Sequence, residues 1–102
     1  MKIDRLNHIR KELAEPPNEI ANKLTVQLIS LLFEQAYYMF RVTPSVEEGI
    51  FIEMDIPKGK VFIEIYNTED IAMCFRDSIT KKVIPYPINY IKEIIHILEI
   101  LY

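Results

Sequence analysis

The stretch GIFIEMDIPKGKVFIEIYNTEDIAMCFRD, residues 49–77, decides the fold. Three runs within it alternate apolar side chains with a mixed set, which is the period of a β-strand. The uniformly apolar set comprises Ile50, Ile52, Met54 and Ile56, then Val61, Ile63 and Ile65, then Ile71, Met73 and Phe75. A three-residue loop at residues 67–69 pairs Ile65 with Ile71. The stretch therefore predicts a three-stranded antiparallel meander with one apolar face directed at the core.

The first hairpin of this meander predicts a pair of facing carboxylates. A two-residue loop at residues 58–59 places Ile56 opposite Val61. The same register puts Glu53 directly opposite Glu64 on the second face of the sheet. Facing like charges are destabilising by up to ~1 kcal/mol, which a cation, a metal or a partner protein would offset. The alternative is that both carboxylates are solvated and cost little.

Two helices are predicted before the meander. Residues 2–14 place four aliphatic side chains on one helical face, namely Ile3, Leu6, Ile9 and Leu13. Pro16 and Pro17 end this helix, and Asn18 begins the next one as its N-cap. The second helix is expected over residues 19–40, packed across the apolar face of the meander.

The sequence after the meander predicts a turn, a short strand and a third helix. Residues 81–84 are interpreted as a fourth, edge strand, and Pro85 and Pro87 are expected to end regular structure there. Residues 89–102 predict a helix that is apolar over more than half of its circumference. The fold class is therefore α+β, a meander of three or four antiparallel strands with elements in the order α-α-β-β-β-α. Residues 1–102 are expected to form a single domain.

The third helix also predicts a homodimer. Its apolar residues form two rows, and only one row can dock on the rest of its own chain. The second row, Ile94, Ile97 and Leu101, would stay in water unless a second copy covered it. Two alternatives remain: both rows pack within one chain, or the helix covers the second face of the sheet.

Composition limits the classes of function. The net charge of −3 and the lack of a basic cluster argue against nucleic acid as a partner. The single cysteine excludes an internal disulfide, and the first residues are charged and unlike a signal peptide, so a cytoplasmic location is expected. No apolar run is long enough for a membrane span, so no membrane partner is expected.

A search for catalytic motifs finds one candidate pair of acids. The chain has no glycine-rich phosphate loop and no histidine or cysteine pairs at metal-ligand spacing, so no cofactor and no metal site are predicted. Cys74 has no histidine near it in the sequence, which argues against a nucleophile. Glu53 and Glu64 would be the acids of a small metal-dependent enzyme, which is the alternative function.

Motifs at the join between helix and sheet resemble those of a group of small, uncharacterised bacterial proteins. In that group a Pro-Pro-Ser or Pro-Pro-Asn opens a helix, and a proline-containing link leads to Gly, alternating apolar residues and Glu. The matching residues are Pro16, Pro17, Asn18, Pro44, Gly49, Ile50, Ile52 and Glu53. The resemblance covers residues 13–66, and the Trp-Asp segment that the group often carries is missing here, since the chain has no tryptophan. The resemblance implies an accessory protein of mobile or defence-related gene clusters and no established chemistry.

The second face of the meander predicts a site for another protein. Phe51, Phe62 and Tyr66 would line this face together with Glu53 and Glu64. Aromatic side chains in a polar surround are typical of the centres of protein interfaces. We therefore predict a small interaction module without enzymatic activity, such as an antitoxin-like protein, an inhibitor or an adaptor. The alternative is that the third helix covers these aromatic residues, which would then be ordinary core.

Overall fold

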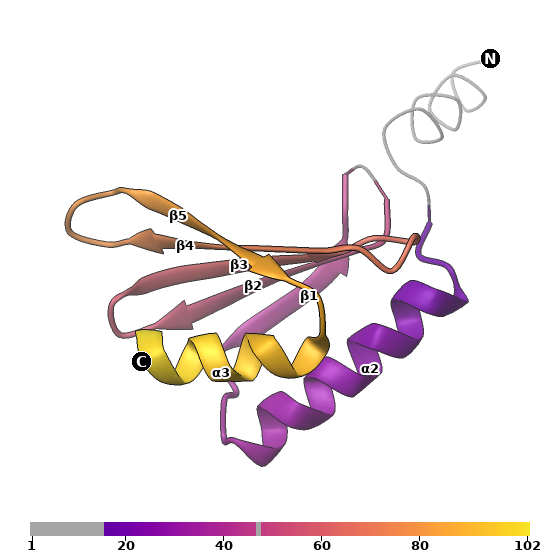
Figure 1. The fold of residues 1–102 in the computed structure, drawn as a ribbon, viewed down its shortest axis with the longest axis horizontal. Helices are drawn as coiled ribbons and strands as arrows, with labels where there is room; N and C mark the ends of the chain where they lie inside the picture. Colours follow the sequence, from indigo (N-terminus) through magenta and orange to yellow (C-terminus); the bar gives the residue numbers. More distant parts are fainter. Residues whose placement is uncertain (1–15, 47) are drawn as a thin grey trace.

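A computed structural model describes residues 16–46 and 48–102 of the chain. The elements are α2 Glu19–Glu34, β1 Phe40–Pro44, β2 Ile50–Ile56, β3 Gly59–Ile65, β4 Ile71–Asp77, β5 Val83–Ile88 and α3 Ile91–Leu101 (Figure 1). The strands form one antiparallel sheet in the order β1-β2-β3-β4-β5. The predicted α+β class is confirmed, but the sheet has five strands, so the prediction of three or four was wrong. Within the described part of the chain, neither helix is both long enough and apolar enough to cross a membrane.

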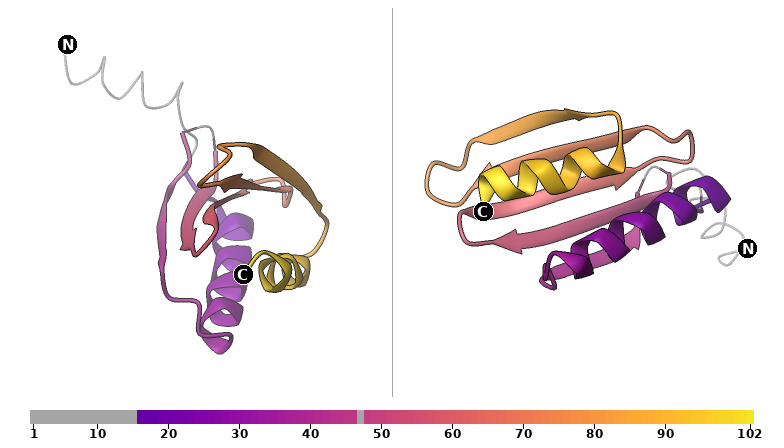
Figure 2. Two further views of the ribbon diagram at one scale, coloured as in Figure 1. Left: turned by 90° about the vertical axis from the view of Figure 1, so that its left-hand side faces the viewer. Right: turned by 60° about the horizontal axis from the view of Figure 1, so that its bottom comes forward.

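Both helices lie on the same side of the sheet (Figures 1 and 2). Every second residue of β2, and of β3 from Val61 onward, is directed at them and is buried, as the alternation predicts. From the helices, Leu28 and Leu32 of α2 and Ile94 and Leu98 of α3 are fully buried against this face. The third helix therefore covers the same face as the second, and it does not cover the opposite face. The helix predicted over residues 2–14 lies outside the described residues.

The second helix begins where it was predicted and ends six residues earlier. Asn18 is its N-cap, and the Asn18 side chain accepts a hydrogen bond from the Ala21 N–H at 2.9 Å. The helix ends at Glu34 because Ala36 adopts a left-handed conformation with φ of 62°. The N–H of Tyr37 donates a hydrogen bond to the Leu32 carbonyl at 2.8 Å, and the N–H of Ala36 donates one to the Phe33 carbonyl at 3.0 Å. This is a Schellman C-cap with alanine at the position where glycine is usual, so the sequence carried no stop signal there.

The residues after this cap form β1, which the sequence-based prediction assigned to the end of the helix and a loop. Phe40 pairs with Met54, Val42 with Ile52 and Pro44 with Ile50, so β1 is an edge strand beside β2. The β-branched residues Val42 and Thr43 favour an extended backbone.

The opposite edge of the sheet is formed by β5, which contains both prolines that were expected to end regular structure. Pro85 pairs with Cys74 and Pro87 with Ala72. Proline is tolerated on an edge strand because its missing N–H then costs no hydrogen bond to a further strand. The prediction that regular structure ends at Pro85 was therefore wrong.

The register of the first hairpin differs from the prediction by two residues. Ile56 pairs with Gly59, and Met54 with Val61, so the turn consists of residues 57–58. A shift of two keeps the apolar side chains on the same face, so the alternation could not exclude it. A Cβ on Gly59 would lie 2.0 Å from the Arg76 carbonyl oxygen, so this glycine permits the close approach of β4. The predicted pairing of Ile65 with Ile71 in the second hairpin is confirmed.

The first described residues are attached to the β3–β4 turn. The N–H of Asn18 donates to the Asn67 side chain at 2.9 Å, and the Asn18 side chain donates to the Asn67 carbonyl at 3.0 Å. The Asn67 side chain in turn donates to the Pro16 carbonyl at 3.1 Å. These bonds hold the start of α2 at the end of the sheet where β3 leads into its turn.

Candidate functional site

The face of the sheet that is turned away from α2 and α3 is the candidate site. We call it the open face, because none of the described helices covers it (Figure 2). Its side chains are those of Arg41, Thr43, Phe51, Glu53, Asp55, Lys60, Phe62, Glu64, Ala72, Cys74, Arg76, Val83, Pro85 and Pro87. They lie in rows across the strands because residues that pair in an antiparallel sheet are directed to the same side.

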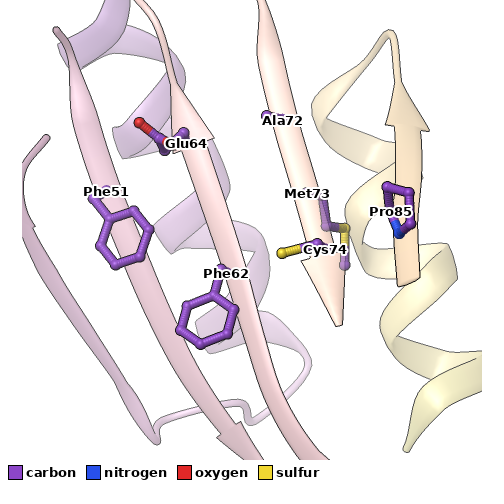
Figure 3. Close-up of a pocket in the computed structure, with 7 residues that line it drawn as sticks. All are labelled: Phe51, Phe62, Glu64, Ala72, Met73, Cys74 and Pro85. Carbon is purple, nitrogen blue, oxygen red and sulfur yellow. The ribbon is translucent and has the colours of Figure 1, made fainter. Parts of the chain in front are cut away.

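The centre of the open face is apolar and slightly hollow. The rings of Phe51 and Phe62 are stacked, with centroids 6.0 Å apart and an interplanar angle of 22°. The guanidinium carbon of Arg76 lies 5.7 Å from the centroid of the Phe62 ring. Beside the rings is a depression of about 190 Å³ lined by Phe51, Phe62, Glu64, Ala72, Met73, Cys74 and Pro85 (Figure 3). Such a depression accepts an apolar side chain between aromatic walls.

One end of the open face carries a compact group of ion pairs. Glu53 accepts hydrogen bonds from Lys60 Nζ at 2.6 Å and from Arg41 Nη2. Asp55 lies 3.7 Å from a nitrogen of each of the same two cations. The hydrogen bonds from Lys60 and then from Arg41 hold the pKa of Glu53 below the ordinary value of 4.5. Glu53 is therefore a stable carboxylate that is already neutralised by its neighbours.

The other end of the open face carries Glu64. Its Oε2 accepts a hydrogen bond from the hydroxyl of Ser45 at 2.7 Å, and Ser45 is buried in the link between β1 and β2. Burial raises the pKa of the Cys74 thiol, and the charge of Glu64 raises it further. Cys74 is therefore a neutral thiol at pH 7, which is the form unsuited to nucleophilic attack.

The structure separates the two acids that were predicted to face each other. Glu53 is opposite Phe62, and Phe51 is opposite Glu64, so the prediction of a facing Glu53–Glu64 pair was wrong. The cause is the two-residue shift of register in the first hairpin. Within the residues that the structure describes, no group of three His, Cys, Asp or Glu side chains is placed to hold a metal ion.

Four of the five residues predicted to bind a partner lie on the open face, namely Phe51, Glu53, Phe62 and Glu64. The fifth, Tyr66, directly follows β3, and its N–H donates to the Asp70 carbonyl at 2.9 Å. The sequence-based prediction missed Arg41, because that residue was assigned to the link after a longer helix. The alternation of Phe40, Val42 and Pro44 with Arg41 and Thr43 was the signal that could have identified it.

The row predicted to form a homodimer interface lies largely inside the single chain. Ile94 is 0% exposed and Leu101 is 8% exposed, and Ile97 is half-buried against the same core. The sheet and α2 cover this row, so its burial needs no second copy. The homodimer itself stays a prediction that the structure of one chain does not test.

Comparison of the chain with protein-family models, with curated proteins and with solved structures finds no significant match. The resemblance to small bacterial proteins therefore stays an interpretation of short motifs. The functional argument rests on the geometry of the open face.

Proposed function

We propose that this protein is an interaction module that binds another protein through the open face. The observation that carries the proposal is the stacked pair Phe51 and Phe62 beside an apolar depression on an uncovered sheet face. Aromatic side chains that become desolvated at the centre of an interface supply most of its binding energy. Charged residues at the border of such a centre add selectivity and speed of association more than affinity.

The chemistry of the open face favours an amphipathic helix as the bound segment. The depression offers a pocket for an aliphatic side chain, and Glu64 at its border offers a carboxylate for a basic side chain. At the opposite end, Arg41 and Lys60 are already paired with Glu53 and Asp55. A partner helix with a row of aliphatic residues and a flanking lysine or arginine is therefore complementary in shape and in charge.

The edges of the sheet are poor binding sites in comparison. Pro85 and Pro87 lie in β5, and Pro44 ends β1. Prolines on edge strands oppose the pairing of a further strand, because they lack the N–H that a new strand would need as a donor. These residues favour binding through side chains on the face over addition of a strand at the edge. Such a contact is compatible with an antitoxin, an inhibitor or an adaptor.

The experiment compares capture of partners by three tagged full-length chains in extracts of the native host. Phe62→Lys places a charge at the centre of the open face, and Ile79→Lys is the matched control, because Ile79 is 89% exposed in the β4–β5 loop. Circular dichroism and thermal melting first establish that both variants are folded. A specific partner should be retained by the wild type and by Ile79→Lys.

Phe62→Lys should weaken the affinity for that partner by at least about 30-fold, the equivalent of a 2 kcal/mol hot spot. The affinity is then measured with the purified pair by calorimetry. Equal binding by all three chains, or no specific partner in any extract, would contradict the proposal.

A further inference from the structure

We infer that the first 15 residues of this chain dock on the open face of the same molecule as an amphipathic helix and occupy it until a partner displaces them. The inference rests on the proposed function in one respect, since it concerns occupancy of the same binding surface. Three features carry it: where the segment joins the sheet, how long it is, and how its apolar and basic residues are spaced.

The segment joins the described structure at the border of the open face. Pro16 is held by Asn67, which follows Tyr66 at the end of β3. The side chains of the open face nearest to this junction belong to the row formed by Phe51, Glu64 and Ala72. The next row contains Phe62 and Cys74. A segment that folds back from Pro16 over the open face therefore meets the apolar depression before it reaches the ion pairs at the far end.

The length of the segment matches the length of the face. Residues 2–14 would span about 20 Å as a helix, at 1.5 Å per residue. The seven residues of β3 span about 23 Å, at 3.3 to 3.4 Å per residue. Residues 14–16 in an extended conformation reach about 10 Å, which is the separation of packed layers. The helix can therefore lie across the open face without strain in the link.

The apolar row of the segment fits the apolar centre of the face. Ile3, Leu6, Ile9 and Leu13 fall on one side of the predicted helix. Leu13 would lie near the row of Phe51 and Ala72. Ile9, about 6 Å further along the helix, would reach the row of Phe62 and Cys74.

Two basic residues of the segment can pair with acids at the end of the face where it is attached. Arg10 and Lys11 are its basic residues nearest to Pro16, and the acids Glu12 and Glu15 lie between them and the junction. They would lie beside Glu64, and beside Glu69 and Asp70 in the β3–β4 turn. The cations of the open face lie at its other end, where Glu53 and Asp55 already neutralise Arg41 and Lys60. The segment thus has the chemistry that the open face is proposed to recognise.

The first test uses Cys74, the single cysteine of the chain, as the reporter. Ile9→Cys in the full-length protein should form an intrachain disulfide with Cys74 in a glutathione redox buffer, because docking brings the two Cα atoms within the distance of about 7 Å that a disulfide requires. His8→Cys is the matched control, because it is adjacent in the sequence and directed to the opposite side of the helix. Mass spectrometry after blocking of free thiols distinguishes an intrachain disulfide from a disulfide between two chains.

An intrachain disulfide that forms at least about tenfold faster in Ile9→Cys than in His8→Cys supports the inference. Equal rates for the two variants overturn it. Disulfides formed only between chains also overturn it, because they would place the segment on a second copy.

The second test measures the alkylation rate of native Cys74 by iodoacetamide in full-length variants. Ile9→Glu should release the segment and raise the rate by about tenfold, which corresponds to a segment that is docked nine-tenths of the time, whereas His8→Glu should leave the rate unchanged. Equal rates in wild type and Ile9→Glu count against docking.

Neither test needs a partner. If both tests fail while Phe62→Lys still weakens partner binding, only the docking of the segment is refuted. If both tests succeed while Phe62→Lys leaves the affinity for the partner unchanged, only the proposed function is refuted.

Discussion

The two faces of the central strands differ in what their side chains do, although the residues alternate along the same backbone. In β3, Val61, Ile63 and Ile65 are fully buried under the two helices. Their neighbours Phe62 and Glu64 are half-buried on the open face, where a stacked ring pair and ion pairs take the place of close packing. The covered face supplies the hydrophobic stabilisation, so residues of the open face are free to be selected for recognition.

The contrast also appears in how each face handles charge. Among the residues that the structure describes, none of those buried on the covered face is charged. On the open face, Lys60 lies opposite Asp55 and Arg41 opposite Glu53, so the register places opposite charges together at one end. A strand can therefore be altered on one face with little effect on the other, and the comparison of Ile63→Ala with Phe62→Ala tests this separation.

The largest effect is expected on the covered face. Ile63→Ala should lower the free energy of unfolding by about 2 to 5 kcal/mol, because it leaves a cavity in the middle of the sheet under the helices. Phe62→Ala, one residue away on the open face, should cost only about 1 to 2 kcal/mol, mainly through the lost ring contact. Urea unfolding curves measure both. Similar losses for the two variants would break the distinction between the faces.

A smaller loss is expected where the helical layer is attached to the sheet. Asn18→Ala removes the N-cap hydrogen bond from the Ala21 N–H and the hydrogen bond from the Asn18 side chain to the Asn67 carbonyl, and it leaves the bond donated by the Asn18 N–H in place. Unfolding should become easier by about 1 to 2 kcal/mol, with α2 losing protection from hydrogen exchange before β3 does. Uniform loss of protection across both elements would show that helix and sheet are not separable layers.

At the other end of α2 a substitution should increase stability. Ala36→Gly removes the steric cost of the left-handed conformation at an exposed residue of the Schellman cap. Glycine also raises the entropy of the unfolded chain, which offsets part of this gain in stability. The net gain should be up to about 1 kcal/mol, seen as a higher midpoint of thermal unfolding. Ala36→Val is the control and should lower the midpoint, because a β-branched residue is disfavoured at positive φ.

The smallest effect concerns acid stability on the open face. Lys60 and Arg41 lower the pKa of Glu53 in the folded protein, so Glu53 binds a proton less readily when folded than when unfolded. Its contribution to stability is therefore present above the unfolded pKa of about 4.5 and is lost as the pH falls through the lower, folded value. Glu53→Gln should make the free energy of unfolding less dependent on pH below about 4.5, as measured by urea denaturation at several pH values. A variant with an unchanged acid slope would contradict this linkage.

Several elements could be predicted because local signals and tertiary packing agree on them. The alternation in residues 50–76 specified three strands and their buried faces, and the second hairpin also has the predicted register. Asn18 was identified as an N-cap, and the helix after residue 89 begins close to its predicted start, where Glu93 accepts hydrogen bonds from the N–H groups of Asn89 and Tyr90.

The elements that were missed have in common that their local signals were weak or misleading. The left-handed residue that ends α2 is Ala36 and not the usual glycine, so the sequence carries no stop signal there. The strand that follows, β1, is only five residues long. The strand β5 contains prolines that its position at the edge makes harmless. The prediction placed most of the candidate partner-binding residues on the correct face. It wrongly paired Glu53 with Glu64, because a register error of two residues leaves the alternation intact and so goes undetected.

The sequence by itself determined which side chains share a face of each strand, because the period of two in its apolar residues allows only one assignment. The tertiary structure alone decided the offset between β2 and β3, since the close approach of β4 at Gly59 and the pairing of Lys60 with Asp55 depend on residues from different strands. It also decided that α2 and α3 share one face of the sheet. An amphipathic helix carries the information that it must be covered, but the surface that covers it exists only when the five strands have assembled.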